Sequence, residues 1–150
     1  MRTPPLPPSP WCRAAACSLA AALLIPGCDG GASDGAPAFA GEPLLRLAGT
    51  QGAVRASLRF DPPSPARGMN AAEYTIVDGA GQPVEGLALR VLPWMPDMGH
   101  GTSITPAVTA VGGGVFVVER LSLFMAGRWQ LRSHLDGPAS DELWPELQIP

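Results

Sequence analysis

The chain has 150 residues and a formal net charge of −3, and it contains no lysine. All 13 acidic residues follow Gly27, where eight arginines oppose them, so residues 28–150 carry a formal charge of −5. A nucleic-acid binder needs a basic stripe that neutralises phosphates, and none is present, so we expect no nucleic-acid partner.

An export signal is predicted over residues 1–27. Arg2 and Arg13 give this segment a weakly positive start, and residues 14–25 form an apolar run of 12 residues. As a helix, this run is too short to cross a bilayer core of about 30 Å, but it fits the apolar region of a signal peptide.

The end of this signal, Leu24-Ile25-Pro26-Gly27-Cys28, resembles a bacterial lipobox. The resemblance implies that Cys28 carries the lipid and that the protein is an extracytoplasmic, membrane-anchored lipoprotein, on the periplasmic side or at the cell surface. Two alternatives stay open. The apolar run could remain as an uncleaved anchor, or an ordinary signal peptidase could cut later, at the small-x-small sequence of residues 38–40.

Residues 28–42 are small and turn-prone, so they are predicted to form a flexible tether between the lipid on Cys28 and a domain over residues 43–150. The other two cysteines, Cys12 and Cys17, lie within the signal. The domain therefore has neither a disulfide framework nor a thiolate metal site.

From Pro43 onward the hydrophobic period is two. Residues 53–60 (AVRASLRF) alternate apolar and polar side chains, as a half-buried strand does, and a Pro-rich stretch then ends the strand. Six more strands are expected, at residues 72–78, 87–92, 105–111, 115–123, 128–135 and 143–149. About seven short strands without a helix predict an all-β, immunoglobulin-like β-sandwich.

One segment, PWMPDMGHG, gathers residues that can bind a metal. Pro96 suits the second position of a β-turn and Asp97 the third, so Met95 and Met98 should face each other across the turn. On an extended chain, Met98 and His100 would point to the same side. The spacing predicts that two thioethers and an imidazole converge.

Thioether sulfur with imidazole favours copper, Cu(I) especially, and suits an oxidising compartment. A structural alternative stays open. Methionines often fill gaps in cores, so the turn could simply cap the sandwich, with His100 forming surface hydrogen bonds.

Three segments resemble the YtkA-like domain family: residues 95–101 (MPDMGHG), 124–129 (FMAGRW) and the turn at 78–84. The resemblance extends over roughly residues 44–149, and implies a small extracytoplasmic immunoglobulin-like domain. It implies copper ligation by Met95, Met98 and His100, with Met125 as a fourth ligand. The family is associated with copper handling, respiratory oxidase maturation and metal efflux, which makes an oxidase or efflux component the implied partner.

Four other residues are interpreted in structural terms. Trp129 is expected in the core, and Trp94 is expected to pack at a strand end unless it covers a bound Cu(I) ion. His134 lies on the wet face of its strand, with joining the metal site as the alternative. Met69 is assigned to a loop.

An enzyme is not expected. Residues after Cys28 offer no cysteine nucleophile, and the sequence has no Gly-x-Ser-x-Gly elbow, P-loop or dinucleotide fingerprint. The leading hypothesis is a lipid-anchored domain that binds copper for delivery, buffering or resistance. The rival hypothesis is a metal-free module that assembles or docks a membrane complex.

Overall fold

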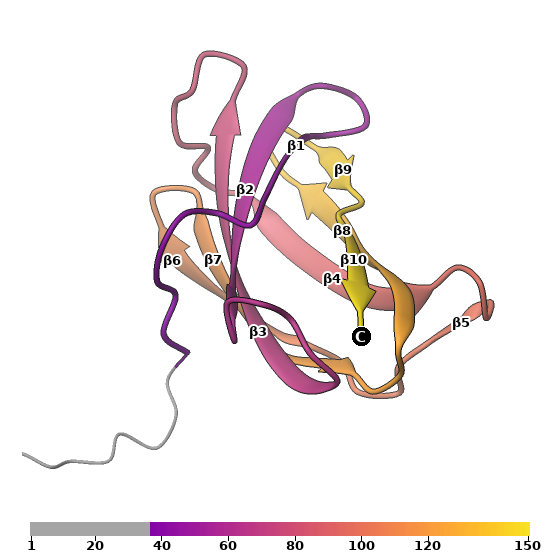
Figure 1. The fold of residues 1–150 in the computed structure, drawn as a ribbon. Coiled ribbons are helices and arrows are strands. Elements are labelled where there is room, and N and C mark those ends of the chain that lie inside the picture. The colour runs from indigo at the N-terminus through magenta and orange to yellow at the C-terminus, as the bar shows by residue number, and fades with distance from the viewer. Residues whose placement is uncertain (1–36) are drawn as a thin grey trace, which may run out of the picture. The chain divides into compact units, whose positions relative to one another are not determined.

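The computed structural model describes residues 37–150, which form two packed antiparallel sheets (Figure 1). The first sheet has the strand order β1-β2-β3-β7-β6, and the second has the order β10-β8-β4-β5, with β9 also paired to β8. The strands are β1 (Leu45–Ala48), β2 (Val54–Asp61), β3 (Gly68–Asp78), β4 (Ala88–Met95), β5 (His100–Gly101), β6 (Ala107–Gly112), β7 (Val115–Leu123), β8 (Gly127–Asp136), β9 (Asp141–Leu143) and β10 (Glu146–Ile149). The expected all-β sandwich of immunoglobulin-like type is confirmed. Within this part of the chain, no helix is long and apolar enough to cross a membrane.

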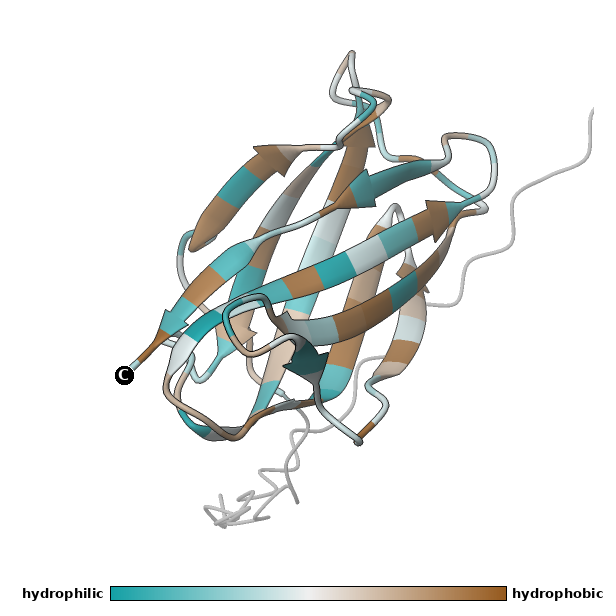
Figure 2. Cartoon of the chain, turned by 90° about the vertical axis from the view of Figure 1, so that its right-hand side faces the viewer, coloured by the Kyte–Doolittle hydropathy of each residue, from teal (hydrophilic) through white to brown (hydrophobic). Residues whose placement is uncertain are grey.

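The strands form because their side chains alternate between a core and a solvent face. In β2, Val54, Leu58 and Phe60 are at most 1% exposed, whereas Arg55 on the opposite face is exposed. Figure 2 shows this alternation as brown and teal bands along the strands. Burial of the apolar faces of both sheets against each other supplies the main stabilisation of the sandwich.

Two aromatic residues fill the space between the sheets. Trp129 of β8 has no exposed surface, which confirms its expected place in the core. Tyr74 of β3 is equally buried, and its hydroxyl oxygen lies 3.1 Å from Oγ of Ser133 on β8. Burial raises the pKa of Tyr74, so the hydroxyl stays protonated and links the two sheets.

Asp141 ties the second sheet to the turn between β1 and β2. Its carboxylate, only 2% exposed, accepts hydrogen bonds from the backbone N–H groups of Gln51, Ala53, Val54 and Glu142, over 2.7–3.3 Å. A buried carboxylate with this many donors is well compensated for the loss of water. It therefore serves as a fixed bridge between distant parts of the chain.

Ten strands exceed the expected seven or so for two reasons. The short strands β1 and β5 were not expected, and residues 143–149, predicted as one strand, form the end of β9 and all of β10. Trp144 and Pro145 separate these two, because proline supplies no N–H to continue a ladder.

The assignment of Met69 to a loop is wrong. The strand predicted at 72–78 begins earlier, at Gly68, so Met69 lies in β3 opposite Ser122. A register shift between Asn70 and Ala72 interrupts the pairing there. Such a bulge breaks the period of two that a sequence pattern relies on.

The first described residues contact the sandwich. The N–H of Ala38 donates to Asp61 over 3.0 Å, and Phe39 lines a hollow together with Thr109 and Val111 of β6. The predicted signal over 1–27 and the predicted lipid-bearing Cys28 lie outside the described residues.

Candidate metal centre

The turn between β4 and β5 is built as its sequence predicts. Both Met98 and Gly99 donate their backbone N–H to the carbonyl oxygen of Met95, over 3.2 and 3.0 Å. Pro96 and Asp97 therefore hold the second and third positions of a β-turn, which confirms that part of the prediction. His100 opens β5 directly opposite Met95.

The side chains do not all follow the expected arrangement. Met95 is 3% exposed and belongs to the core, whereas Met98 is 54% exposed and His100 is also exposed. The premise that Met98 and His100 share an extended chain is wrong, because residues 96–99 are all turn and Gly99 has a φ of +69°. His100 instead shares a face with Met95, its directly opposite partner across the β4–β5 pair.

The segment that leads into β8 packs against this turn. Arg128 forms an ion pair with Asp97, with 2.7 Å between Nη2 and Oδ1. The rings of Phe124 and His100 are stacked, with centroids 6.4 Å apart and planes inclined by 15°. The hydrogen bond from Arg128 lowers the pKa of the Asp97 carboxyl, so this ion pair is intact at neutral pH.

Met125 lies within the same segment, partly buried against the core. Its carbonyl oxygen accepts a hydrogen bond of 2.9 Å from the indole Nε1 of Trp129. Trp129 also meets Phe124 edge to face, with ring centroids 5.5 Å apart. The buried tryptophan therefore anchors the segment that places Met125 at the same end of the sandwich as the turn.

The four candidate residues thus share one end of the molecule, and their chemistry fits a soft metal ion. When Nδ1 of His100 carries the proton, it donates to the carbonyl oxygen of Gly101 at 3.1 Å and leaves Nε2 as a metal ligand. Over residues 37–150, no group of three or more His, Cys, Asp and Glu side chains is placed to hold a metal ion. Thioethers with one imidazole are a donor set for copper rather than for zinc or calcium.

Two other candidates lie on the outer face of the second sheet. Trp94 packs at the strand end as expected: its ring contacts Arg132, and the residue is paired with Gly101 of β5. His134 is on the same outer face, where its Nδ1 lies 3.1 Å from Oε1 of Glu142. It is paired across the sheet with Arg90, well along β4 from Met95, and does not join the candidate centre.

Sequence reasoning missed the contacts that hold the centre together. Asp97 was interpreted only as a turn residue, whereas it also binds Arg128. The stacking of Phe124 on His100 was likewise not expected. The available signal was that Phe124 and Arg128 flank Met125 in the second motif, but a pairing between two motifs about 25 residues apart cannot be read without the fold.

Gly127 shows how closely the two segments approach. A Cβ atom there would lie 3.1 Å from Cε of Met95, and the residue has a φ of +124°, where side chains are strained. We expect Gly127→Ala to destabilise the domain by about 1–3 kcal/mol, measured by thermal or urea unfolding. Gly68→Ala is the matched control, since Gly68 has a φ of +112° and a Cβ atom there would meet nothing within 4 Å. Equal losses for both variants would show that the Met95 contact is unimportant.

Comparison with known proteins gives one family. The YtkA-like family model matches residues 51–134, more than half of the chain. No curated protein matches. Among solved structures, that of FdeC, an Escherichia coli adhesin, is similar over 71% of this chain and 33% of its own, at 20% identity and a TM-score of 0.46. This chain therefore corresponds to about a third of the length of that adhesin chain.

Proposed function

The chain belongs to the YtkA-like family, and from that premise we propose that it binds copper, with Cu(I) favoured, at the β4–β5 turn. Met98 and His100 supply the exposed ligands, and Met95 and Met125 supply donors from beneath them. Copper bound there would be delivered to a partner, buffered, or kept away from sensitive proteins. A respiratory oxidase or a metal-efflux component is the proposed partner.

One observation carries this proposal: the turn at residues 95–100 and the segment at residues 124–128, which contain the thioether and imidazole donors, contact each other at one end of the sandwich. The Arg128–Asp97 ion pair and the stacking of Phe124 on His100 bring residues 124–128 onto the turn. Thioether and imidazole are neutral donors that suit a soft cation, and they add no negative charge that would hold the cation more tightly. Reversible loading, as delivery or buffering needs, is consistent with that set.

Export and lipid anchoring through Cys28 belong to the same proposal and rest on the sequence alone. A lipid anchor would hold the domain outside the cytoplasm, where copper is handled without competing thiolates. We expect cells that express the chain to incorporate labelled palmitate into it, and the Cys28→Ala variant to lose that label. Label retained by the variant would refute lipidation at Cys28.

The experiment for copper binding is a Cu(I) titration of the full chain against a competing chelator, with Zn(II) in a parallel series. We expect one equivalent of Cu(I) to be withdrawn from the chelator and no comparable competition for Zn(II). Failure to withdraw Cu(I) would refute the copper proposal. The rival, a metal-free docking module for a membrane complex, predicts that failure.

Arg128 is expected to tune the site without touching the metal. Arg128→Gln removes the ion pair with Asp97, which is exposed and contributes little to stability. We expect Cu(I) affinity to fall by no more than about 5-fold, which corresponds to the roughly 1 kcal/mol that an exposed ion pair contributes at most, with an unchanged Tm. Arg120→Gln, an exposed arginine on β7, is the matched control and should keep full affinity. An Arg128→Gln variant with wild-type affinity would show that the ion pair does not position the turn.

A further inference from the structure

On the outer face of the second sheet, an arginine side chain lies between two tryptophans. The guanidinium carbon of Arg132 lies 4.6 Å from the ring centre of Trp94 and 5.5 Å from that of Trp144. These residues come from β8, from β4 and from the link between β9 and β10. Cation–π contacts of this kind hold a long, flexible side chain in one place.

The hydrogen-bonding capacity of this guanidinium is largely unused. Within residues 37–150, Arg132 forms no ion pair, and its one hydrogen bond runs from Nε to Oε1 of Gln130 over 3.4 Å. By contrast, Arg90 and Arg128 on the same face are paired with carboxylates. The two terminal nitrogens of an arginine can donate two parallel hydrogen bonds to a carboxylate. A guanidinium that is held in place and has no partner can therefore bind a carboxylate with little loss of side-chain freedom.

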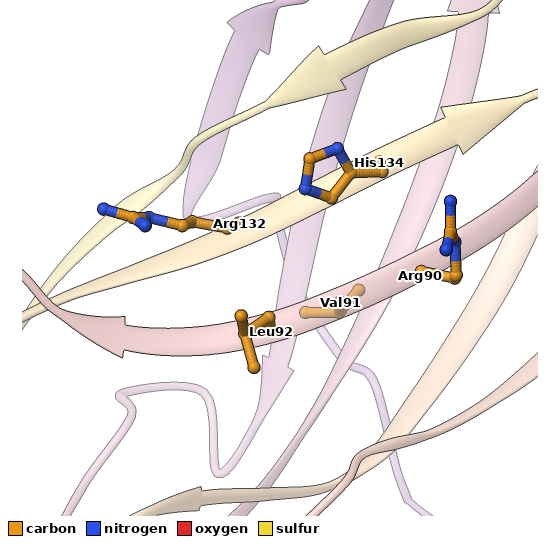
Figure 3. Close-up of a pocket in the computed structure, with 5 residues that line it drawn as sticks. All are labelled: Arg90, Val91, Leu92, Arg132 and His134. Carbon is orange, nitrogen blue, oxygen red and sulfur yellow. The ribbon is translucent and has the colours of Figure 1, made fainter. Parts of the chain in front are cut away.

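A hollow of about 340 Å³ lies beside this arginine. Figure 3 shows its lining, with Arg132 extending along the sheet away from Arg90. The lining residues are Arg90, Val91, Leu92, Arg132 and His134. Leu92 is directly opposite Arg132 on the neighbouring strand and 46% exposed, and Trp144 is 44% exposed. An apolar surface therefore adjoins the free guanidinium.

We propose that this outer face binds an acidic, partly apolar segment of a partner protein. A carboxylate of the segment would pair with the terminal nitrogens of Arg132, and an apolar side chain would enter the hollow against Leu92. The contact between the carboxylate and Arg132 is inferred from charge complementarity, because this guanidinium is unpaired. Tryptophan and arginine are also the residue types that dominate binding energy in protein–protein interfaces.

A protein segment fits this surface better than an anionic bilayer does. The chain has a net charge of −3, and Asp136, Glu142 and Glu146 lie on β8, β9 and β10 around the same face. These three carboxylates already lie beside Arg90, His134 and Arg128. Among the described residues of this face, Arg132 is therefore the one guanidinium left for an incoming anion, which suits a single carboxylate better than a broad surface of anionic headgroups. This proposal does not depend on copper binding.

The test uses the full chain and two arrays of capped hexapeptides with randomised apolar residues. One array carries a single Glu at position 3, and the other carries Gln there. We expect members of the Glu array to bind and their Gln counterparts to bind at least about tenfold more weakly, the effect of one charge-assisted hydrogen bond. The Arg132→Gln variant should bind the Glu peptides at least about tenfold more weakly than the wild type does.

Arg55→Gln, an exposed arginine on the first sheet, is the control and should bind like the wild type, with thermal unfolding confirming that both variants fold. The proposal is overturned if no Glu peptide binds, or if Arg132→Gln binds like the wild type. It is also overturned if the chain binds phosphatidylglycerol vesicles through Arg132 and no peptide, since the surface would then be a lipid-binding one.

Discussion

Replacing Met98 by leucine is expected to weaken Cu(I) binding by at least about 100-fold while leaving the domain folded. Outer-shell groups alone cost about 10- to 100-fold in metal affinity, and a lost ligand costs more. Leucine nearly conserves the volume of methionine but has no sulfur. Because Met98 is 54% exposed, little packing is lost and the Tm should stay unchanged. Chelator competition gives the affinity, and circular dichroism gives the Tm.

Met69→Leu is the matched control for that experiment. Met69 is 59% exposed and lies on β3, in the other sheet, so its thioether takes no part in the proposed site. Unchanged affinity in Met69→Leu with loss in Met98→Leu would assign the binding to the turn. Equal affinity in both variants would remove Met98 from the ligand set. If the turn merely caps the sandwich, neither variant changes metal binding.

The largest effect on stability is expected from Asp141→Asn. The amide keeps the shape of the carboxylate, but its NH₂ group must face backbone donors, because each carboxylate oxygen accepts two backbone N–H groups. A buried donor left without a partner costs about 1–3 kcal/mol, so a loss of several kcal/mol is expected at pH 7. Urea unfolding measures it, with the exposed Asp136→Asn as the control that should change little.

The same carboxylate predicts a dependence on acid. Burial by itself would raise the pKa of Asp141, but the hydrogen bonds from Gln51, Glu142, Ala53 and Val54 outweigh it and hold the pKa below the ordinary value of 3.8. A lowered pKa in the folded state stabilises the fold fully above that ordinary value, and the contribution is lost as the pH falls through the folded-state pKa. The stability difference between wild type and Asp141→Asn should therefore shrink below pH 4. A difference that stays constant down to pH 2 would contradict this role.

The sandwich could be predicted from sequence wherever a strand has one wet and one buried face. Residues 115–123 were predicted with the bounds that β7 has, and the strand expected at 53–60 differs from β2 by one residue at each end. Strand β5 could not be predicted, since His100 and Gly101 are too few for any pattern to appear. The bridging role of Asp141 was also hidden, because its donors at 51–54 are brought to it only by the fold.

The residues of the candidate site and its β-turn could be predicted from the sequence, but the burial of each side chain could not. Pro96 and Asp97 dictate a β-turn through local backbone preferences, which a sequence reveals directly. The burial of Met95 depends on where β4 ends over the core, and Met98 is exposed within the turn at residues 96–99, in which Gly99 is left-handed. Neither is fixed by residue spacing alone. The ligand roles of these residues and of Met125 stay predictions.

X-ray absorption at the copper edge, on the full chain loaded with one equivalent of Cu(I), tests the central claim most directly. A centre made from Met95, Met98, His100 and Met125 predicts a first shell of sulfur scatterers with one nitrogen, and the Met98→Leu variant should lose sulfur from that shell. A first shell of nitrogen and oxygen without sulfur would contradict a thioether copper site at the β4–β5 turn.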